Sequence, residues 1–337
     1  MARSVYLAHT GGTIGMKRTA KGYAPEPGYL AEHLAAMPEL QAPDMPRLTV
    51  REYTPLLDSA DMTPRDWERI GRDIVAHHDQ YDGFVVLHGT DTMAYSASAL
   101  SFMLEHLAKP VILTGSQIPL AEVRSDAREN LITSLLLAAH YPLPEVCIYL
   151  SGQLLRGNRA RKVSASGFDA FASPNAPPLG TVGVEIAIAW ERVRPKSSAR
   201  VALQPLGEVS VGALRLFPGI TAGIVENLLR APVRGMVLET YGAGNAPARD
   251  TALMGVLEAA CARGVVIVNC TQCLRGSVMM SYATGQALQQ AGVVSGHDMT
   301  PEAALTKLFY LLSKGLPPQE IRQLVQQDLR GELTSVA

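Results

Sequence analysis

Short apolar runs rich in β-branched residues alternate with amphipathic stretches of helical length through the first two thirds of the chain. This alternation constrains the fold most strongly, because it is the pattern of a parallel sheet covered by helices. Strands are expected at residues 4–9, 83–88, 110–114 and 146–150, and helices at 93–106 and 124–140. We therefore predict an α/β fold built on a doubly wound, mainly parallel sheet.

A helix start signal lies ahead of the second expected strand. Thr63 has the residue type of an N-cap, Pro64 stands at the first helical position, and Asp66 places an acid three residues after the cap. Ile70 and Ile74 then recur at helical spacing. A helix is predicted to begin at Pro64.

The chain length and one stretch of unusual composition predict two domains. With 337 residues, the chain exceeds the usual size of a single hydrophobic core. Residues 191–208 concentrate arginine, serine and proline, as linkers do. A second alternation follows, with strands expected at 209–217, 234–240 and 265–269 and helices at 221–230, 249–263, 300–314 and 317–329. The predicted parts are a larger N-terminal catalytic domain (1–190), a linker (191–208) and a smaller C-terminal α/β domain (209–337).

Charge and apolar patterning exclude several classes of partner. Thirty basic and 31 acidic residues leave a net charge of −1, without the basic stripe that nucleic-acid binding needs. No run of about eighteen apolar residues predicts a membrane span, and the apolar part of residues 1–9 is too short for a signal peptide. Four sparse cysteines are unlike a disulfide framework. We expect a cytoplasmic protein with reduced thiols and with neither a nucleic acid nor a membrane as partner.

Three expected strands end in glycines and small hydroxyl residues. Ligands of an open parallel sheet bind outside the carboxyl ends of its strands. His-Thr-Gly-Gly-Thr-Ile-Gly (9–15), His-Gly-Thr-Asp-Thr (88–92) and Thr-Gly-Ser-Gln (114–117) should therefore lie at one edge of the sheet. Glycines let a substrate approach the backbone amides, and a nearby hydroxyl attacks a carbonyl once a base removes its proton. This convergence predicts a site at which a hydroxyl attacks a carbonyl group, with Thr13 as a candidate nucleophile.

Each of these features also has a plainer explanation. A glycine pair after a strand is usually a turn, and His88 at a strand end would satisfy local backbone groups. The sequence contains neither a GxGxxG nor a GxxxxGK[ST] motif, so a nucleotide cradle lacks its fingerprint. It also lacks the GxSxG elbow of common serine hydrolases. Cys270 and Cys273 form a single CxxC without a second pair, so no metal site is predicted.

Lys162 is a candidate base for a hydroxyl nucleophile. A lysine serves as a base when burial or a neighbouring charge lowers its pKa. Lys162 follows the expected strand at 146–150 and should reach the same edge of the sheet. Most lysines are solvated, so composition alone leaves its role open.

Two segments resemble the signatures of the asparaginase/glutaminase family. Leu-Ala-His-Thr-Gly-Gly-Thr-Ile-Gly (7–15) and Gly-Phe-Val-Val-Leu-His-Gly-Thr-Asp-Thr-Met (83–93) match the two signatures at the family's spacing, which is highly specific. Residues 55–64 and 167–175 resemble the bacterial cytoplasmic, type I branch, and residues 241–247 and 329–333 extend the similarity into the second domain. The resemblance covers the whole chain.

The resemblance implies the reaction L-asparagine + water → L-aspartate + ammonia, without a metal or an organic cofactor. It gives Thr13 the role of nucleophile, with Tyr23 on a mobile loop that closes over the site. Thr90, Lys162 and Asp91 would form a second triad. The expected substrate contacts are Gly12, Asp58, Ser59, Gly89, Thr90, Asp91 and, from a neighbouring subunit, Asn245. Which of Thr13 and Thr90 attacks first stays open.

The resemblance also implies an assembly and a second site. The family builds its active sites at the interface of an intimate homodimer, and two such dimers usually form a tetramer. Some type I enzymes have an effector site for asparagine with an arginine just ahead of the Tyr-Gly-x-Gly-Asn run. This chain has Glu239 there, while Thr271 and Cys273 remain as candidate effector-site residues. A carboxylate repels the α-carboxylate of an effector, so weak or absent activation by asparagine is predicted.

Other functions remain open from the sequence. A broader glutaminase-asparaginase is the first alternative, because one methylene of substrate length is typically discriminated by about 1–3 kcal/mol. An amide-cleaving subunit of a tRNA-dependent amidotransferase is the second, although it should need a partner. A non-catalytic amino-acid sensor is the third. The presence of Thr13, Thr90, Asp91 and Lys162 together argues against a sensor.

Overall fold

The computed structural model describes residues 3–20, 22–279 and 283–334. The chain splits into two compact units, Met1–Gln204 and Pro205–Ala337, which are described here one at a time. The division falls after Gln204, and the domain and linker bounds inferred from composition stay predictions. No helix among these described residues is long and apolar enough to cross a membrane.

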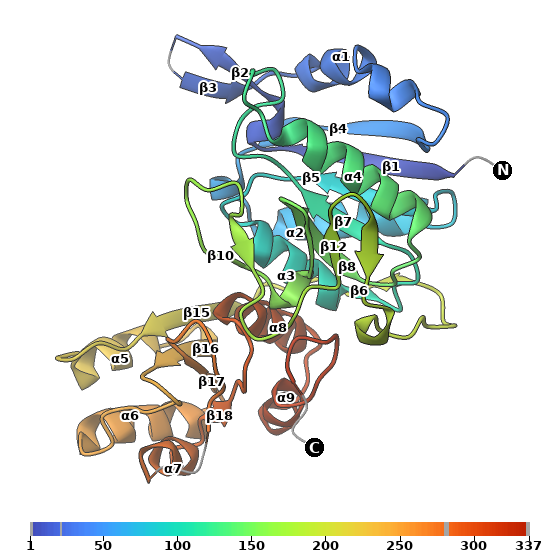
Figure 1. The fold of residues 1–337 in the computed structure, drawn as a ribbon. Helices are drawn as coiled ribbons and strands as arrows, with labels where there is room; N and C mark the ends of the chain where they lie inside the picture. Colours follow the sequence, from blue (N-terminus) through green and yellow to red (C-terminus); the bar gives the residue numbers. More distant parts are fainter. Residues whose placement is uncertain (1–2, 21, 280–282, 335–337) are drawn as a thin grey trace. The chain divides into compact units, whose positions relative to one another are not determined.

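An eight-stranded sheet forms the centre of the first unit (Figure 1). Its order is β13-β12-β9-β8-β7-β5-β1-β4, and the strands from β8 to β4 are parallel. The parallel strands are β1 (Ser4–Gly11), β4 (Arg47–Leu57), β5 (Gly83–Leu87), β7 (Val111–Thr114) and β8 (Val146–Leu150). The antiparallel edge consists of β9 (Gln153–Arg156), β12 (Gly180–Val182) and β13 (Ile186–Ile188). The predicted doubly wound, mainly parallel sheet is confirmed.

Helices cover both faces of this sheet. The helices are α1 (Tyr29–Ala35), α2 (Pro64–His77), α3 (Met93–Met103) and α4 (Ala127–His140). Alternate residues of β1 separate two apolar cores: Tyr6 packs with residues of α2 and α3, and Leu7 with residues of α1 and α4. Both faces of the central strands are therefore buried against helices, which explains their continuous apolar sequences.

The start of α2 follows its predicted signal. Asp66 Oδ2 accepts hydrogen bonds from Thr63 N at 2.8 Å and from Thr63 Oγ1 at 2.7 Å. The helix expected at 93–106 ends earlier, at Met103, because the chain there turns into β6 (Leu104–Glu105), which pairs with β14 (Ala202–Leu203). The helix expected at 124–140 begins later, at Ala127.

Several elements of this unit have no clear signal in the sequence. The longest is β4, an edge strand in which Tyr53 is the one fully buried residue, so its apolar alternation is weak. A hairpin of β2 (Met16–Thr19) and β3 (Gly22–Pro25) follows β1. The short elements are η1 (Thr13–Gly15), η2 (Pro38–Gln41), η3 (Ser59–Asp61), η4 (Gly157–Arg159), η5 (Trp190–Arg192), β10 (Arg161–Lys162) and β11 (Phe171–Ala172).

The second unit is a smaller α/β structure around a parallel sheet. Its order is β15-β16-β17-β18, with bounds β15 (Ser210–Arg215), β16 (Val233–Thr240), β17 (Val266–Thr271) and β18 (Val294–Ser295). Its helices are α5 (Ala222–Leu228), α6 (Thr251–Ala262), α7 (Ala283–Gln290), α8 (Pro301–Ser313) and α9 (Pro318–Val325). The expected strands and helices of this part are present, while α7 and β18 were not predicted.

Candidate active site

The turn after β1 is shaped by two glycines. Gly11 and Gly12 have φ values of 134° and 87°, which L side chains rarely adopt. A Cβ on Gly12 would lie 2.4 Å from Gly89 N, so the turns that follow β1 and β5 touch backbone to backbone. Thr13 comes directly after this contact and begins η1. The convergence of the two strand ends is therefore observed.

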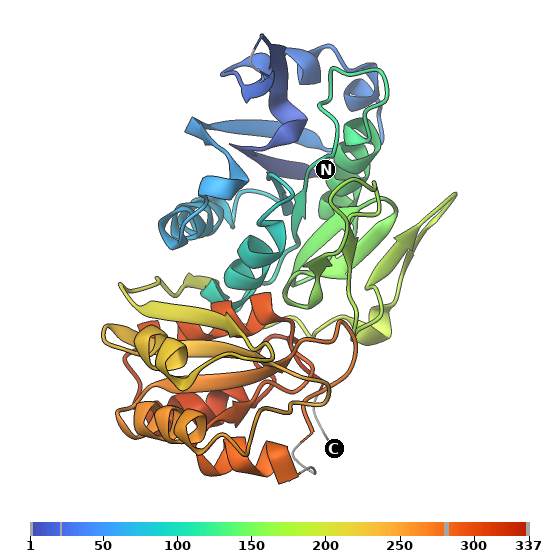
Figure 2. The ribbon, with the colours of Figure 1, turned by 90° about the vertical axis from the view of Figure 1, so that its left-hand side faces the viewer.

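The segment after β4 completes the same edge. A Cβ on Gly89 would lie 2.3 Å from Ser59 Oγ, and Thr92 Oγ1 donates to Ser59 O at 2.7 Å. Asp58 Oδ1 accepts a hydrogen bond from Ala60 N at 3.0 Å, so this carboxylate holds the turn on which Ser59 lies. Figure 2 views the first unit from the side on which β1 ends.

Lys162, Thr90 and Asp91 lie together. Lys162 Nζ donates to Thr90 Oγ1 at 2.9 Å and to Asp91 Oδ1 at 2.6 Å. Thr90 is buried and the Lys162 side chain is 20% exposed, whereas Asp91 is 65% exposed. The lysine reaches this position on β10, which pairs with β11. Lys162 thus contacts Thr90 and Asp91, the two residues with which the family resemblance grouped it.

Gln117 is a site residue that the sequence-derived set lacked. Thr90 Oγ1 donates to Gln117 Oε1 at 3.1 Å, and Gln117 Nε2 donates to Gly167 O at 3.0 Å. The strand-end segment 114–117 did point to this edge of the sheet. The contact itself also depends on the loop near Gly167, whose path carries no local sequence signal.

Tyr23 lies on the β2–β3 hairpin and is 47% exposed. Its hydroxyl donates to Glu122 Oε1 at 3.0 Å, and this hydrogen bond raises the pKa of the Tyr23 phenol. In this structure the Tyr23 hydroxyl is therefore directed to a carboxylate on the loop ahead of α4.

A buried hydrogen-bond chain supports the turn between β5 and Thr90. Trp67 Nε1 donates to Ser96 Oγ at 2.9 Å, Ser96 Oγ lies 2.8 Å from His88 Nε2, and His88 Nδ1 lies 2.7 Å from Gly89 O. These partners fit a neutral imidazole that donates through Nδ1 and accepts through Nε2. Complete burial lowers the pKa of His88 to about 4, so the ring is neutral at pH 7.

This lowered pKa gives a testable pH dependence. The imidazole has an ordinary value of 6.5, so the unfolded chain binds the extra proton first as the pH falls from about 6.5 to about 4. Wild-type stability should therefore decline over this window relative to His88→Gln, by about 2 kcal/mol between pH 6.5 and 4.5. Urea unfolding of both proteins at several pH values measures this, and a constant difference between them would contradict it.

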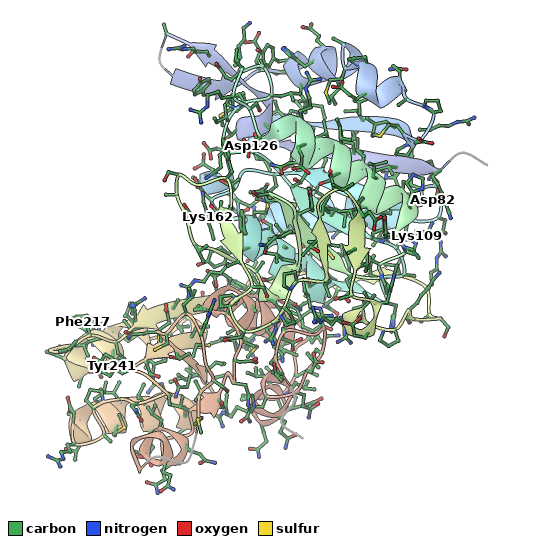
Figure 3. All side chains as sticks on the ribbon, in the orientation of Figure 1. Asp82, Lys109, Asp126, Lys162, Phe217 and Tyr241 are labelled. Carbon is green, nitrogen blue, oxygen red and sulfur yellow. The ribbon has the colours of Figure 1, made fainter. Side chains whose placement is uncertain are left out.

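Residues of the second unit gather around the turn after β16. Thr271 Oγ1 donates to Gly242 O at 2.5 Å, and Cys273 N donates to Thr271 Oγ1 at 3.0 Å. Asn245 closes the turn through paired backbone hydrogen bonds with Tyr241, which Figure 3 labels. The Glu239 side chain is 15% exposed and lies 3.8 Å from Arg215 Nη1. Glu239 lies opposite Arg215 in the register of β15 and β16, so its carboxylate stands beside a cation.

The edge of the first unit at which β1 ends differs chemically from the opposite edge. Figure 3 shows Asp126 and Lys162 on the side where β1 ends, and Asp82 and Lys109 on the other. Lys109 Nζ donates hydrogen bonds to the carbonyl oxygens of His78 and Tyr81, each at 2.6 Å. No group of three or more His, Cys, Asp or Glu side chains in the described part of the chain is arranged to hold a metal ion. The polar groups that the structure brings together at the site are hydroxyls, a lysine, the Asp91 carboxylate and backbone amides.

Comparison with known proteins identifies the family. Residues 4–194 match the family described as Asparaginase, N-terminal, and residues 210–325 match the Glutaminase/Asparaginase C-terminal domain. The chain belongs to the asparaginase/glutaminase family.

Relatives within the family are similar over nearly the full chain. The chain is 54% identical to L-asparaginase 1 of Escherichia coli (strain K12) over 333 residues, 98% of each protein. The crystal structure of L-asparaginase I from Vibrio cholerae matches with a TM-score of 0.93 at 51% identity, covering 99% of this chain and 100% of that one. The structure of the thermostable L-asparaginase from Thermococcus kodakarensis matches with a TM-score of 0.89 at 35% identity, and the coverage of both chains is the same. The resemblance to the type I branch and the fold class are confirmed.

Proposed function

We propose that the protein is an amidohydrolase that converts L-asparagine and water into L-aspartate and ammonia. The observation that carries the proposal is the contact of Lys162 Nζ with both Thr90 Oγ1 and Asp91 Oδ1, at the edge of the sheet where Thr13 follows its glycine turn. A hydroxyl, a lysine and closely apposed glycine turns supply a nucleophile, a base and backbone amides, three kinds of group that acyl transfer uses. The similarity to L-asparaginases selects the amide.

The proposed reaction has two steps. Thr13 Oγ1 forms a bond with the side-chain amide carbon of asparagine, the C–N bond breaks, and ammonia leaves with the proton of the hydroxyl. Water then attacks the resulting ester and releases aspartate, which restores Thr13. Backbone amides near Gly12 and Gly89 stabilise the negative charge that develops on the oxygen in each step. Tyr23 closes over the site with its hairpin.

We assign the remaining site residues to substrate binding. Ser59 and Asp91 hold the α-carboxylate and the α-ammonium group, and Asp58 keeps the Ser59 turn in place. Asn245 of the partner subunit completes the site, so the functional form is a homodimer or a dimer of dimers. No metal or organic cofactor takes part in these steps. The proposed location is the cytoplasm.

The test is ammonia release from asparagine and from glutamine by the purified protein. The proposal is supported if kcat/KM for asparagine is much higher than kcat/KM for glutamine. Comparable release from glutamine would favour the broader glutaminase-asparaginase, since the two substrates differ by one methylene, worth about 1–3 kcal/mol. Activity that needs an added partner would favour an amidotransferase subunit. Asparagine binding without ammonia release would favour the sensor.

Glu239 leads to a prediction about regulation. Because a carboxylate stands where an effector's α-carboxylate would need a cation, the rate should rise hyperbolically with asparagine concentration. Initial rates over a wide concentration range measure this, with Glu239→Gln as the control for charge. A sigmoidal curve that Thr271→Ala abolishes would contradict the prediction.

A further inference from the structure

Gln117 links two parts of the active site that are distant in sequence. It follows β7, and its side chain lies between Thr90, after β5, and the loop at 165–167, after β10. Besides the bond to Gly167 O at 3.0 Å, its Nε2 lies 3.4 Å from Ala165 O. Both ends of the amide are therefore engaged.

These contacts fix which way the Gln117 amide points. The oxygen and the nitrogen of a glutamine amide are assigned from the surrounding hydrogen bonds. Gly167 O and Ala165 O are acceptors, so they require the NH₂ group, and the amide oxygen must face Thr90. Gln117 Oε1 is therefore a pure acceptor beside the Thr90 hydroxyl.

Lys162 determines where the Thr90 hydrogen goes. A charged lysine has three donors and no acceptor, and Lys162 Nζ donates to Thr90 Oγ1 and to Asp91 Oδ1. The Thr90 hydroxyl cannot donate back to a charged Lys162, so its hydrogen points to Gln117 Oε1, 3.1 Å away. One lone pair of Thr90 Oγ1 faces Lys162, and the other remains for a water or a substrate.

We propose that Gln117 is a positioning residue that sets the direction of the Thr90 hydroxyl during the reaction. The inference rests on the proposed function and deepens it at the same site. An amide oxygen holds the hydroxyl hydrogen but does not remove the proton. The proton is transferred only when Lys162 is neutral and the hydroxyl turns toward it. Gln117 thus keeps Thr90 aligned without competing as a base.

The main chain of Gln117 is held rigidly, as such a role requires. Asp126 accepts hydrogen bonds from Gln117 N at 3.0 and 3.1 Å and from Ile118 N at 3.0 Å. Asn130 Nδ2 donates to Asp126 Oδ2 at 3.2 Å and to Gly115 O at 3.1 Å. Asp126, at the N-terminal end of α4, therefore fixes the loop that carries Gln117 (Figure 3).

The test compares two substitutions of Gln117 with a matched loop variant. Gln117→Met keeps the length of the side chain and removes all three hydrogen bonds of its amide. Gln117→Glu keeps an acceptor for Thr90 but adds a negative charge and loses the donor to Gly167. Ser164→Ala is the control, because Ser164 Oγ accepts from Gly167 N at 2.9 Å and stabilises the same loop from its other side. Steady-state kcat and KM for ammonia release are measured for each variant.

We expect Gln117→Met to lower kcat about three- to tenfold, as loss of one neutral hydrogen bond does, with KM changed less than about twofold. The freed hydroxyl hydrogen no longer has a fixed acceptor, so the loss falls on kcat rather than on KM. Gln117→Glu keeps an acceptor for Thr90 and should therefore lose less kcat than Gln117→Met. Ser164→Ala should keep kcat near the wild-type value.

Two results would overturn the inference. One is a Gln117→Met enzyme with wild-type kcat. The other is a Ser164→Ala enzyme that reproduces the loss of kcat in Gln117→Met, because loop order alone would then explain it. If Gln117→Met does not fold, Gln117→Leu, which also lacks the acceptor for Thr90, is measured in its place and its kcat decides. A wild-type enzyme that releases no ammonia would instead contradict the proposed function, so the two failures are distinct.

Discussion

Thr13→Ala should lower kcat for asparagine by about a thousandfold or more, because it removes the atom that forms the acyl-enzyme. Thr13 is half-buried at the end of the glycine turn, and its side chain is not part of an apolar core. The variant should therefore fold with nearly wild-type stability. Ammonia release under saturating asparagine measures kcat, and urea unfolding confirms that the loss is not a loss of folded protein.

Two companion variants identify which threonine attacks first. Thr13→Ser retains a hydroxyl and should recover a large part of the activity lost in Thr13→Ala. Thr90→Val removes the hydroxyl that contacts Lys162 and Gln117. If Thr13 attacks first and Thr90 acts on the water, Thr90→Val should still release a burst of about one ammonia per active site. Near-normal turnover in Thr13→Ala would overturn the assignment, and a burst in that variant would favour Thr90 as the first nucleophile.

The fold could be predicted where burial dictates the sequence on both sides of a strand. Residues 83–87 are apolar without interruption because α3 and α4 cover the two faces of β5. The edge strand β4 was not predicted because most of its side chains are exposed. Which residues of an edge strand are buried depends on the elements packed against it, and the local sequence does not show these. The β2–β3 hairpin was missed for the same reason, since its residues are mostly exposed.

The candidate site divides along similar lines. Thr13, Thr90 and Asp91 follow strands that the sequence identifies, so their convergence needs only the rule that parallel strands end at one edge. Lys162 needed the family resemblance, because its place depends on the short β10–β11 pairing, which has no periodic signal. Gln117 was missed because its partners Thr90 and Gly167 lie 27 and 50 residues away, and the loop that carries Gly167 has no local sequence signal.

The second unit contains a buried ion pair that ties its C-terminal segment to α8. The side chains of Lys307 and Glu332 are both 0% exposed, and they form an ion pair with each other. Lys307 Nζ also donates to Val325 O at 2.8 Å and to Gln327 O at 2.5 Å. Glu332 accepts hydrogen bonds from the backbone amides of residues 329 and 330. Each charged group is thus paired with the opposite charge and with polar groups of the main chain.

Lys307→Met should lower the free energy of unfolding by about 3–5 kcal/mol, because it leaves the Glu332 carboxylate buried without its cation. Urea unfolding followed by circular dichroism measures this change. Lys17→Met is the matched control: Lys17 pairs with Glu26 at the surface, where both side chains are nearly half exposed, so its loss should cost less than about 1 kcal/mol. Adding Glu332→Gln to Lys307→Met should restore part of the stability, since the amide keeps an acceptor for the backbone while the unpaired charge is gone. A Lys307→Met protein as stable as the Lys17→Met control would show that the pair does not hold this segment.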